Sequence, residues 1–144
     1  MLSPLSYWIL LLAVTAYAFI KGRMDERMAA TICVAATVGT ILVHSPLSVR
    51  FSTVEIGVLT VDALAFFAFT AIALRTDRFW PLWVAGLQLT TTMAHFLKAV
   101  DLDLVPQAYA AAARLWVYPI FLIIVIGTWR SSRRASDQGY PTLA

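Results

Sequence analysis

Two apolar segments of the chain carry polar side chains of the kinds that bind polar ligands or transfer protons. In the first segment, residues 54–74, Glu55 and Asp62 are seven residues apart, which places both carboxylates on one face of a helix. The second segment, residues 80–99, holds a stripe at three- or four-residue steps that consists of Gln88, Thr91, Thr92, His95 and Lys98. Polar groups are costly in hydrocarbon unless they are paired. We therefore expect the two segments to share a polar face.

If these segments cross a membrane, their estimated depths place the Arg114 side chain within reach of this face. At about 1.5 Å per helical residue, Asp62 falls roughly 3 Å outward of the membrane midplane, and His95 and Arg114 roughly 8 Å outward. The Arg114 side chain is long enough to reach Asp62, and Tyr118 follows one turn further in on the same face. A buried carboxylate must pair, be protonated or face water. We predict a cluster of Asp62, His95 and Arg114, with hydrogen bonds from Gln88, Thr91, Thr92 and Tyr118.

Two interpretations of this cluster remain open. In the structural interpretation, an ion pair between Asp62 and Arg114 holds two helices together, and the Thr and Gln side chains add hydrogen bonds between helices. In the functional interpretation, the cluster lines a cavity open to the outside, where it binds a small polar ligand or relays a proton. The residue types fit both interpretations.

Other ligand chemistry has less support in the sequence. His44 and His95 are candidate axial ligands of a b-type haem, but His44 ends a helix and lies about 4–5 Å shallower than His95. Asp101 and Asp103 offer the oxygen ligands that suit Mg²⁺ or Ca²⁺, although two carboxylates in a loop more often cap a helix. We predict no haem and no metal, and we assign no cofactor. We also find no pairing of a nucleophile with a base that would indicate an enzyme.

The segments that position these residues are long and apolar. The 144 residues are 60% hydrophobic and 13% charged, whereas a soluble domain is about one quarter charged. Five segments approach the roughly 20 residues that cross a membrane, namely residues 5–20, 28–44, 54–74, 80–99 and 106–129. The predicted fold is therefore all-α: a polytopic membrane protein with a bundle of five transmembrane helices in residues 1–129. Residues 130–144 are predicted to form a short basic cytoplasmic tail.

The distribution of Lys and Arg predicts the orientation. If the loops alternate, one side of the membrane receives eight of the 11 basic residues: Lys21, Arg23, Arg27, Arg75, Arg78, Arg130, Arg133 and Arg134. The other side receives Arg50, Lys98 and Arg114. Four acids fall on each side, so the charge is 8 − 4 = +4 against 3 − 4 = −1, which sum to +3. Because basic loops stay inside, we predict an outer N-terminus and an inner C-terminus in a multi-pass inner (plasma) membrane protein of bacterial type.

Together these features predict a non-catalytic membrane component: a subunit, an oligomer or an accessory scaffold. Its partners would be the lipid bilayer and transmembrane helices, either of its own copies or of other proteins. Small residues in two of the segments permit close helix contacts; they are Ala29, Ala30, Ala35, Ala36, Gly39 and residues 110–113. The alternative is a small transporter or proton-coupled carrier that uses the polar cluster, and a second alternative is a haem-binding electron-transfer protein. Nucleic acid is not an expected partner, because the basic surface is small.

Overall fold

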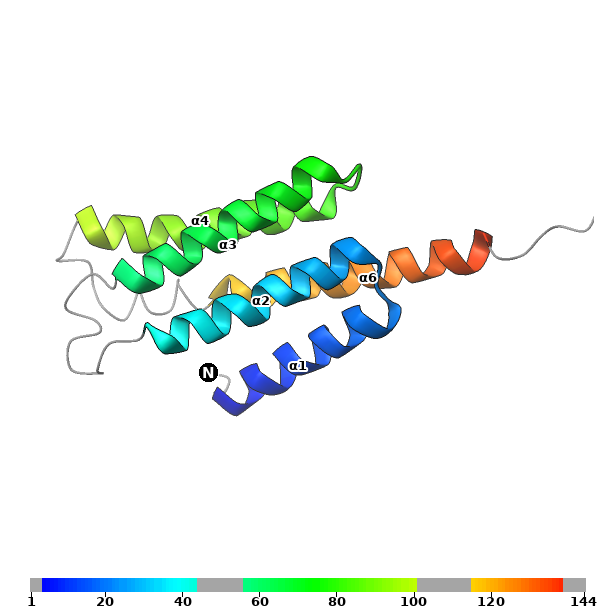
Figure 1. Ribbon diagram of the computed structural model, residues 1–144, viewed down its shortest axis with the longest axis horizontal. Coiled ribbons are helices and arrows are strands. Elements are labelled where there is room, and N and C mark those ends of the chain that lie inside the picture. Colours follow the sequence, from blue (N-terminus) through cyan, green and yellow to red (C-terminus); the bar gives the residue numbers. More distant parts are fainter. Residues whose placement is uncertain (1–3, 44–55, 101–114, 139–144) are drawn as a thin grey trace, which may run out of the picture.

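The protein forms an all-helical bundle in the part of the chain that its structure, a computed structural model, describes: residues 4–43, 56–100 and 115–138. Five helices occupy these residues (Figure 1): α1 (Pro4–Lys21), α2 (Met24–Leu42), α3 (Ile56–Arg75), α4 (Trp80–Val100) and α6 (Val117–Gln138). No strand occurs within these ranges. The predicted all-α fold is confirmed for them.

The helices follow one another around a ring. Each helix packs against the next, α6 returns to α1, and one further contact joins α2 and α6. Helices α3 and α6 do not pack against each other within the described ranges. The turns between α1 and α2 and between α3 and α4 lie at the same end of the bundle, and α6 projects past the other helices at this end (Figure 1).

Most of the side chains in the interior of the ring are apolar, and many on its exterior are apolar too. Leu11, Phe121 and Ile124 are almost completely buried, and the Phe121 ring lies 5.9 Å from that of Tyr7, measured between centroids. Large exposed apolar side chains occur on all five helices, for example Leu12, Ile41, Phe67, Leu82 and Leu122. A helix that is apolar on all sides is typical of a protein core or of a membrane.

One of the described helices, α3, is long and apolar enough to cross a membrane. The apolar helix Leu5–Lys21 is shorter. One such helix is weak support for membrane association and does not by itself establish the predicted five spans.

Several helix ends differ from the sequence prediction, and two of them extend well past the predicted apolar segments. Helix α2 begins at Met24 instead of residue 28, because Asp25 and Glu26 suit the first turn, where the helix dipole favours negative charge. Helix α6 continues to Gln138, whereas its span was predicted to end at Trp129. Residues 130–138 contain no Gly or Pro to stop a helix. Charge therefore marked the predicted limits of the apolar segments but not the ends of the helices.

Small residues allow α2 and α3 to approach closely. An added Cβ at Gly39 would lie 3.2 Å from Cγ2 of Val61, and one at Gly57 would lie 2.7 Å from Cβ of Val43. Ala29 and Ala30 of α2 are buried. These contacts agree with the close packing that the small residues of α2 predicted.

Candidate functional site

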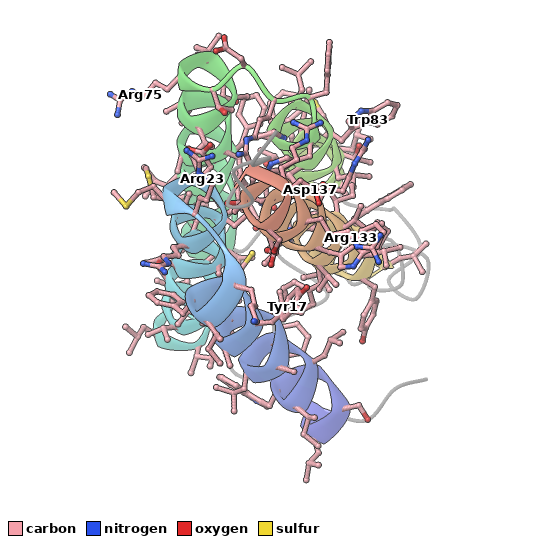
Figure 2. The ribbon with its side chains drawn as sticks, turned by 90° about the vertical axis from the view of Figure 1, so that its right-hand side faces the viewer. Tyr17, Arg23, Arg75, Trp83, Arg133 and Asp137 are labelled. Carbon is pink, nitrogen blue, oxygen red and sulfur yellow. The ribbon has the colours of Figure 1, made fainter. Side chains whose placement is uncertain are left out.

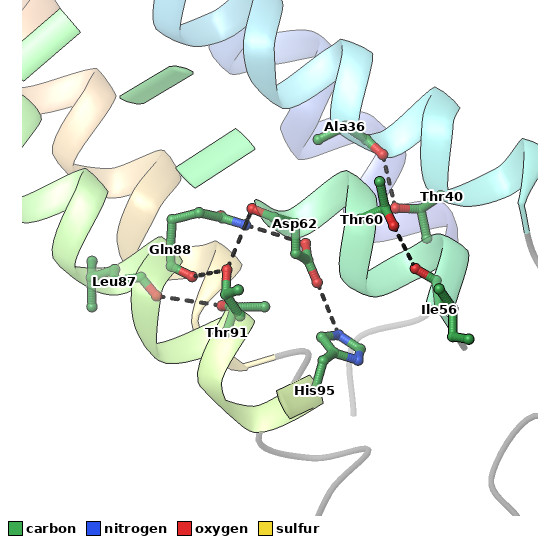
Figure 3. Close-up of polar contacts among 10 residues, drawn as sticks. Ala36, Thr40, Ile56, Thr60, Asp62, Leu87, Gln88, Thr91 and His95 are labelled. Atoms are coloured by element: carbon green, nitrogen blue, oxygen red, sulfur yellow. Dashed lines mark hydrogen bonds and ion pairs between the residues drawn. The ribbon is translucent and has the colours of Figure 1, made fainter. Parts of the chain in front are cut away.

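The turn between α3 and α4 folds the two helices back against each other and brings Asp62 to the polar stripe of α4. The imidazole Nε2 of His95 lies 2.9 Å from Oδ2 of Asp62 (Figure 3). The side chains are 11% and 14% exposed, respectively. This carboxylate–imidazole pair is therefore largely but not completely enclosed.

Two more residues of α4 bond to Asp62. Nε2 of Gln88 donates to Oδ1 of Asp62 at 3.2 Å and lies 3.3 Å from its backbone oxygen. The hydroxyl of Thr92 lies 3.4 Å from the same backbone oxygen and 3.0 Å from that of Gln88. Both carboxylate oxygens of Asp62 thus have a partner on α4. Hydrogen bonds to both carboxylate oxygens offset most of the free-energy cost of burying this polar group between helices.

The pair between Asp62 and His95 can hold one proton in two arrangements. With the proton on the imidazole, the pair is an ion pair; with the proton on the carboxyl, both groups are neutral. The carboxylate also fixes the imidazole orientation and favours a proton on Nε2. The chemistry within reach of this arrangement is proton transfer or the binding of a polar group, and neither requires a nucleophile.

The structure brings together four of the predicted site residues and separates two others. Asp62, Gln88, Thr92 and His95 meet in the seam between α3 and α4. The buried hydroxyl of Thr91, in contrast, bonds back to the carbonyl of Leu87 in its own helix.

Tyr118 lies on α6, which does not pack against α3 in the described part of the chain. The sequence periodicity placed Thr91 on the polar stripe and Tyr118 on the face of Arg114, but helix packing decides which of these side chains meets Asp62.

Several candidates lie outside the described residues, and their roles stay predictions. These are Glu55 and Arg114 of the polar cluster, Asp101 and Asp103 of the weak metal candidate, and His44 of the weak haem candidate. Lys98 belongs to the last turn of α4, but its side chain is outside the described part. The predicted pair between Asp62 and Arg114 therefore remains untested. No group of three His, Cys, Asp or Glu residues that could hold a metal ion occurs in the described ranges.

The sequence interpretation missed a second buried ionic contact, at the opposite end of the bundle. The Glu26 side chain is completely buried; its Oε1 lies 2.6 Å from Nη1 of Arg78, and its Oε2 accepts the backbone N–H of Arg23 at 2.8 Å. Nearby, the hydroxyl of Thr76 donates to Oδ2 of Asp25 at 3.0 Å. The sequence did offer one signal. Glu26 is the third residue of α2, a position from which a Glu side chain can accept the backbone N–H of the residue before the helix.

Two buried polar atoms in the described part of the seam between α4 and α6 have no hydrogen-bond partner: Nε1 of Trp80 and Oγ of Ser131. Trp80 packs against α6, where an added Cβ at Gly127 would lie 3.2 Å from the indole ring. Ser131 follows Gly127 by four residues and is on the same side of α6. The two unpaired groups therefore belong to one interface.

Comparisons with protein-family models, curated proteins and solved structures give no match for this chain. The described helices form a ring, and a carboxylate–imidazole pair lies in the seam between α3 and α4. Its function must be inferred from that geometry.

Proposed function

We propose that this protein is a multi-pass inner-membrane protein that acts as a non-catalytic component, packing against lipid and against transmembrane helices of its own copies. The observation that carries the proposal is the mutual bonding of the polar groups between α3 and α4. Asp62 accepts hydrogen bonds from two side chains of α4, and Thr92 reaches its backbone oxygen. Polar groups that bond one another in this way stabilise contacts between membrane helices.

The exterior of the bundle supports the membrane location. Exposed side chains such as Leu64, Phe67, Leu97 and Leu122 would place a large apolar surface in water if the protein were soluble. Basic residues cluster at the bundle end that holds the two short turns, as expected for the inner side of a membrane. We propose five spans with the N-terminus outside.

Extraction and mass measurement test this proposal. The protein should remain in membrane vesicles washed with alkaline carbonate, which releases proteins that do not span the bilayer. Native mass spectrometry from detergent should then give a multiple of the 15.9 kDa chain mass. Release by carbonate would contradict the membrane location, and a mass of one chain would contradict assembly from copies.

A second candidate function is proton-coupled transport, which the short distance between Asp62 and His95 favours. Their side chains are largely enclosed, but protein atoms leave 14% of the Asp62 side chain and 11% of the His95 side chain uncovered. Ionisable groups within membrane helices commonly belong to proton pathways.

Purified protein in liposomes that contain a pH-sensitive dye tests this candidate. An imposed proton gradient should collapse faster than in empty liposomes, and Asp62→Asn should abolish the difference. Thr91→Val is the matched control, because Thr91 is buried in α4 but bonds only within its own helix. Equal proton flux for the unmodified protein and Asp62→Asn would reject the carrier.

A further inference from the structure

We propose that the basic end of the bundle is a binding surface for the headgroups of anionic phospholipids. We define this end as the α1–α2 turn, the α3–α4 turn and the C-terminal part of α6. The proposal rests on the membrane location proposed above, but it adds a lipid preference that the apolar exterior alone would not produce.

Three separate parts of the chain are held together at this end. The ion pair between Arg78 and Glu26, and the hydrogen bond between Thr76 and Asp25, join the α3–α4 turn to the start of α2. On the other side, Trp80 packs against Gly127, which brings α6 to the start of α4. Figure 2, which faces this end, shows Arg23, Arg75 and Arg133 at separate positions around it.

Exposed charge at this end is predominantly positive. Glu26 is buried against Arg78, and Asp25 is half-buried and accepts a hydrogen bond from Thr76. The exposed acids of this end, among the described residues, are Asp77 and Asp137. The exposed basic residues are Lys21, Arg23, Arg27, Arg75, Arg130, Arg133 and Arg134. A surface with seven exposed cations and two exposed carboxylates attracts a negatively charged membrane face.

The arrangement on α6 suits a phosphate group in particular. Arg130, Arg133 and Arg134 follow three- and four-residue steps, so they form one stripe on the helix. The guanidinium carbon of Arg133 lies 4.6 Å from the ring centroid of Trp129, and this contact restrains the side chain. A restrained guanidinium offers paired N–H donors that match the oxygens of a phosphate.

Exposed aromatic rings indicate a lipid headgroup layer and not a soluble polyanion as the occupant. Trp129, Trp83 and Phe79 lie at the same end and are 48%, 69% and 82% exposed. Tryptophan favours the depth of the headgroups, where its ring meets apolar chains and its N–H meets water. A soluble polyanion would require the cations but not these rings.

Spin-labelled lipids measure the proposed preference. The full-length protein is placed in phosphatidylcholine vesicles with a small amount of spin-labelled phosphatidylglycerol or spin-labelled phosphatidylcholine. The fraction of label immobilised by the protein gives the relative affinity of each lipid. We expect phosphatidylglycerol to be preferred at low salt, and the preference to fall as salt rises.

Variants locate the binding surface. Replacing Arg130, Arg133 and Arg134 together by Gln should remove most of the preference, and each single change should lower it by up to roughly fivefold. Asp137→Asn should strengthen it, because that change removes a negative charge next to the stripe. Arg50→Gln, at a residue predicted on the other side of the membrane, is the control for loss of one charge.

Equal immobilisation of the two lipids at low salt would overturn the proposal. An equal loss of preference in Arg50→Gln and Arg133→Gln would overturn it as well, because the preference would then belong to no particular end. The same vesicles are washed with alkaline carbonate. Retention without lipid preference refutes only the lipid site, whereas release of the protein refutes the membrane location itself.

Discussion

His95 of α4 and Asp62 of α3 meet across one helix seam, with Nε2 and Oδ2 2.9 Å apart. The contact gives Asp62 a partner whose own charge depends on a proton, in addition to the neutral Gln88. The pair thus adds a directional bond to a seam that also contains apolar contacts, the Gln88 amide and the Thr92 hydroxyl. Its contribution to stability is measurable by substitution of each partner.

A double-mutant cycle should show coupling between the two residues. Asp62→Ala and His95→Ala should each lower the free energy of unfolding in detergent by about 1–3 kcal/mol, because each leaves a buried polar group without its partner. The double variant should lose clearly less than the sum of the two. Additive losses would show that the side chains do not interact in solution.

Arg78→Ala should be among the most damaging single changes at the basic end. It leaves the buried carboxylate of Glu26 without its ionic partner, and breaking a buried pair in this way costs about 3–5 kcal/mol. Arg75→Ala is the matched control, because Arg75 is exposed and should change stability by no more than about 0.5 kcal/mol. Thermal unfolding of both variants in detergent makes the comparison, and similar midpoints would contradict the burial of Glu26.

Two glycine substitutions should act in opposite directions. Gly57→Ala places a Cβ 2.7 Å from Cβ of Val43, and overpacking of this kind costs about 1–3 kcal/mol. At Gly86 an added Cβ meets nothing within 4 Å, so Gly86→Ala should stabilise α4 by about 0.4–1 kcal/mol through a lower backbone entropy of the unfolded chain. If both unfolding midpoints rise, the α2–α3 contact at Gly57 is looser than described; if both fall, the space around Gly86 is occupied.

Removing the hydroxyl of Ser131 should cost little or should stabilise the protein. This hydroxyl is buried without a partner, so Ser131→Ala eliminates an unsatisfied group. Thr37→Val is the comparison, because it takes away the hydroxyl that lies 2.7 Å from that of Tyr7 and should cost about 1 kcal/mol. If Ser131→Ala is the more damaging change in a thermal melt, Ser131 has a bonding partner in solution.

Thiol labelling in intact cells checks the proposed topology. In a Cys33→Ala background, a cysteine at Ser3 should react with a membrane-impermeant reagent and one at Ser136 should not, because the basic ends of the helices are proposed to face inward. Permeabilised cells, in which both positions should react, provide the control. The reverse pattern would invert the orientation.

The sequence predicted features that depend on the periodicity of one helix better than features that depend on how several helices pack. A short turn and a polar stripe were enough to predict that Asp62 faces α4. They did not separate Thr92, which reaches Asp62, from Thr91, which bonds to Leu87, because adjacent residues differ only by a rotation that packing decides.

Burial of Glu26 was missed for a related reason. Acids near the basic loops entered only the sum of charges on each side of the membrane, whereas the ion pair with Arg78 depends on a contact between two turns that are far apart in the sequence.

The ring has a consequence for biosynthesis, because its closing contact joins the first and last described helices. Leu11 and Tyr7 of α1 pack in the part of the core that includes Phe121 of α6. A ribosome adds about 5–20 residues per second, so α1 waits on the order of ten seconds before this part of α6 is made. Until then its inner face has only α2 for contact among the helices that later enclose it. Ring closure is therefore a late step of assembly, and a nascent chain truncated before α6 should remain an open row of helices.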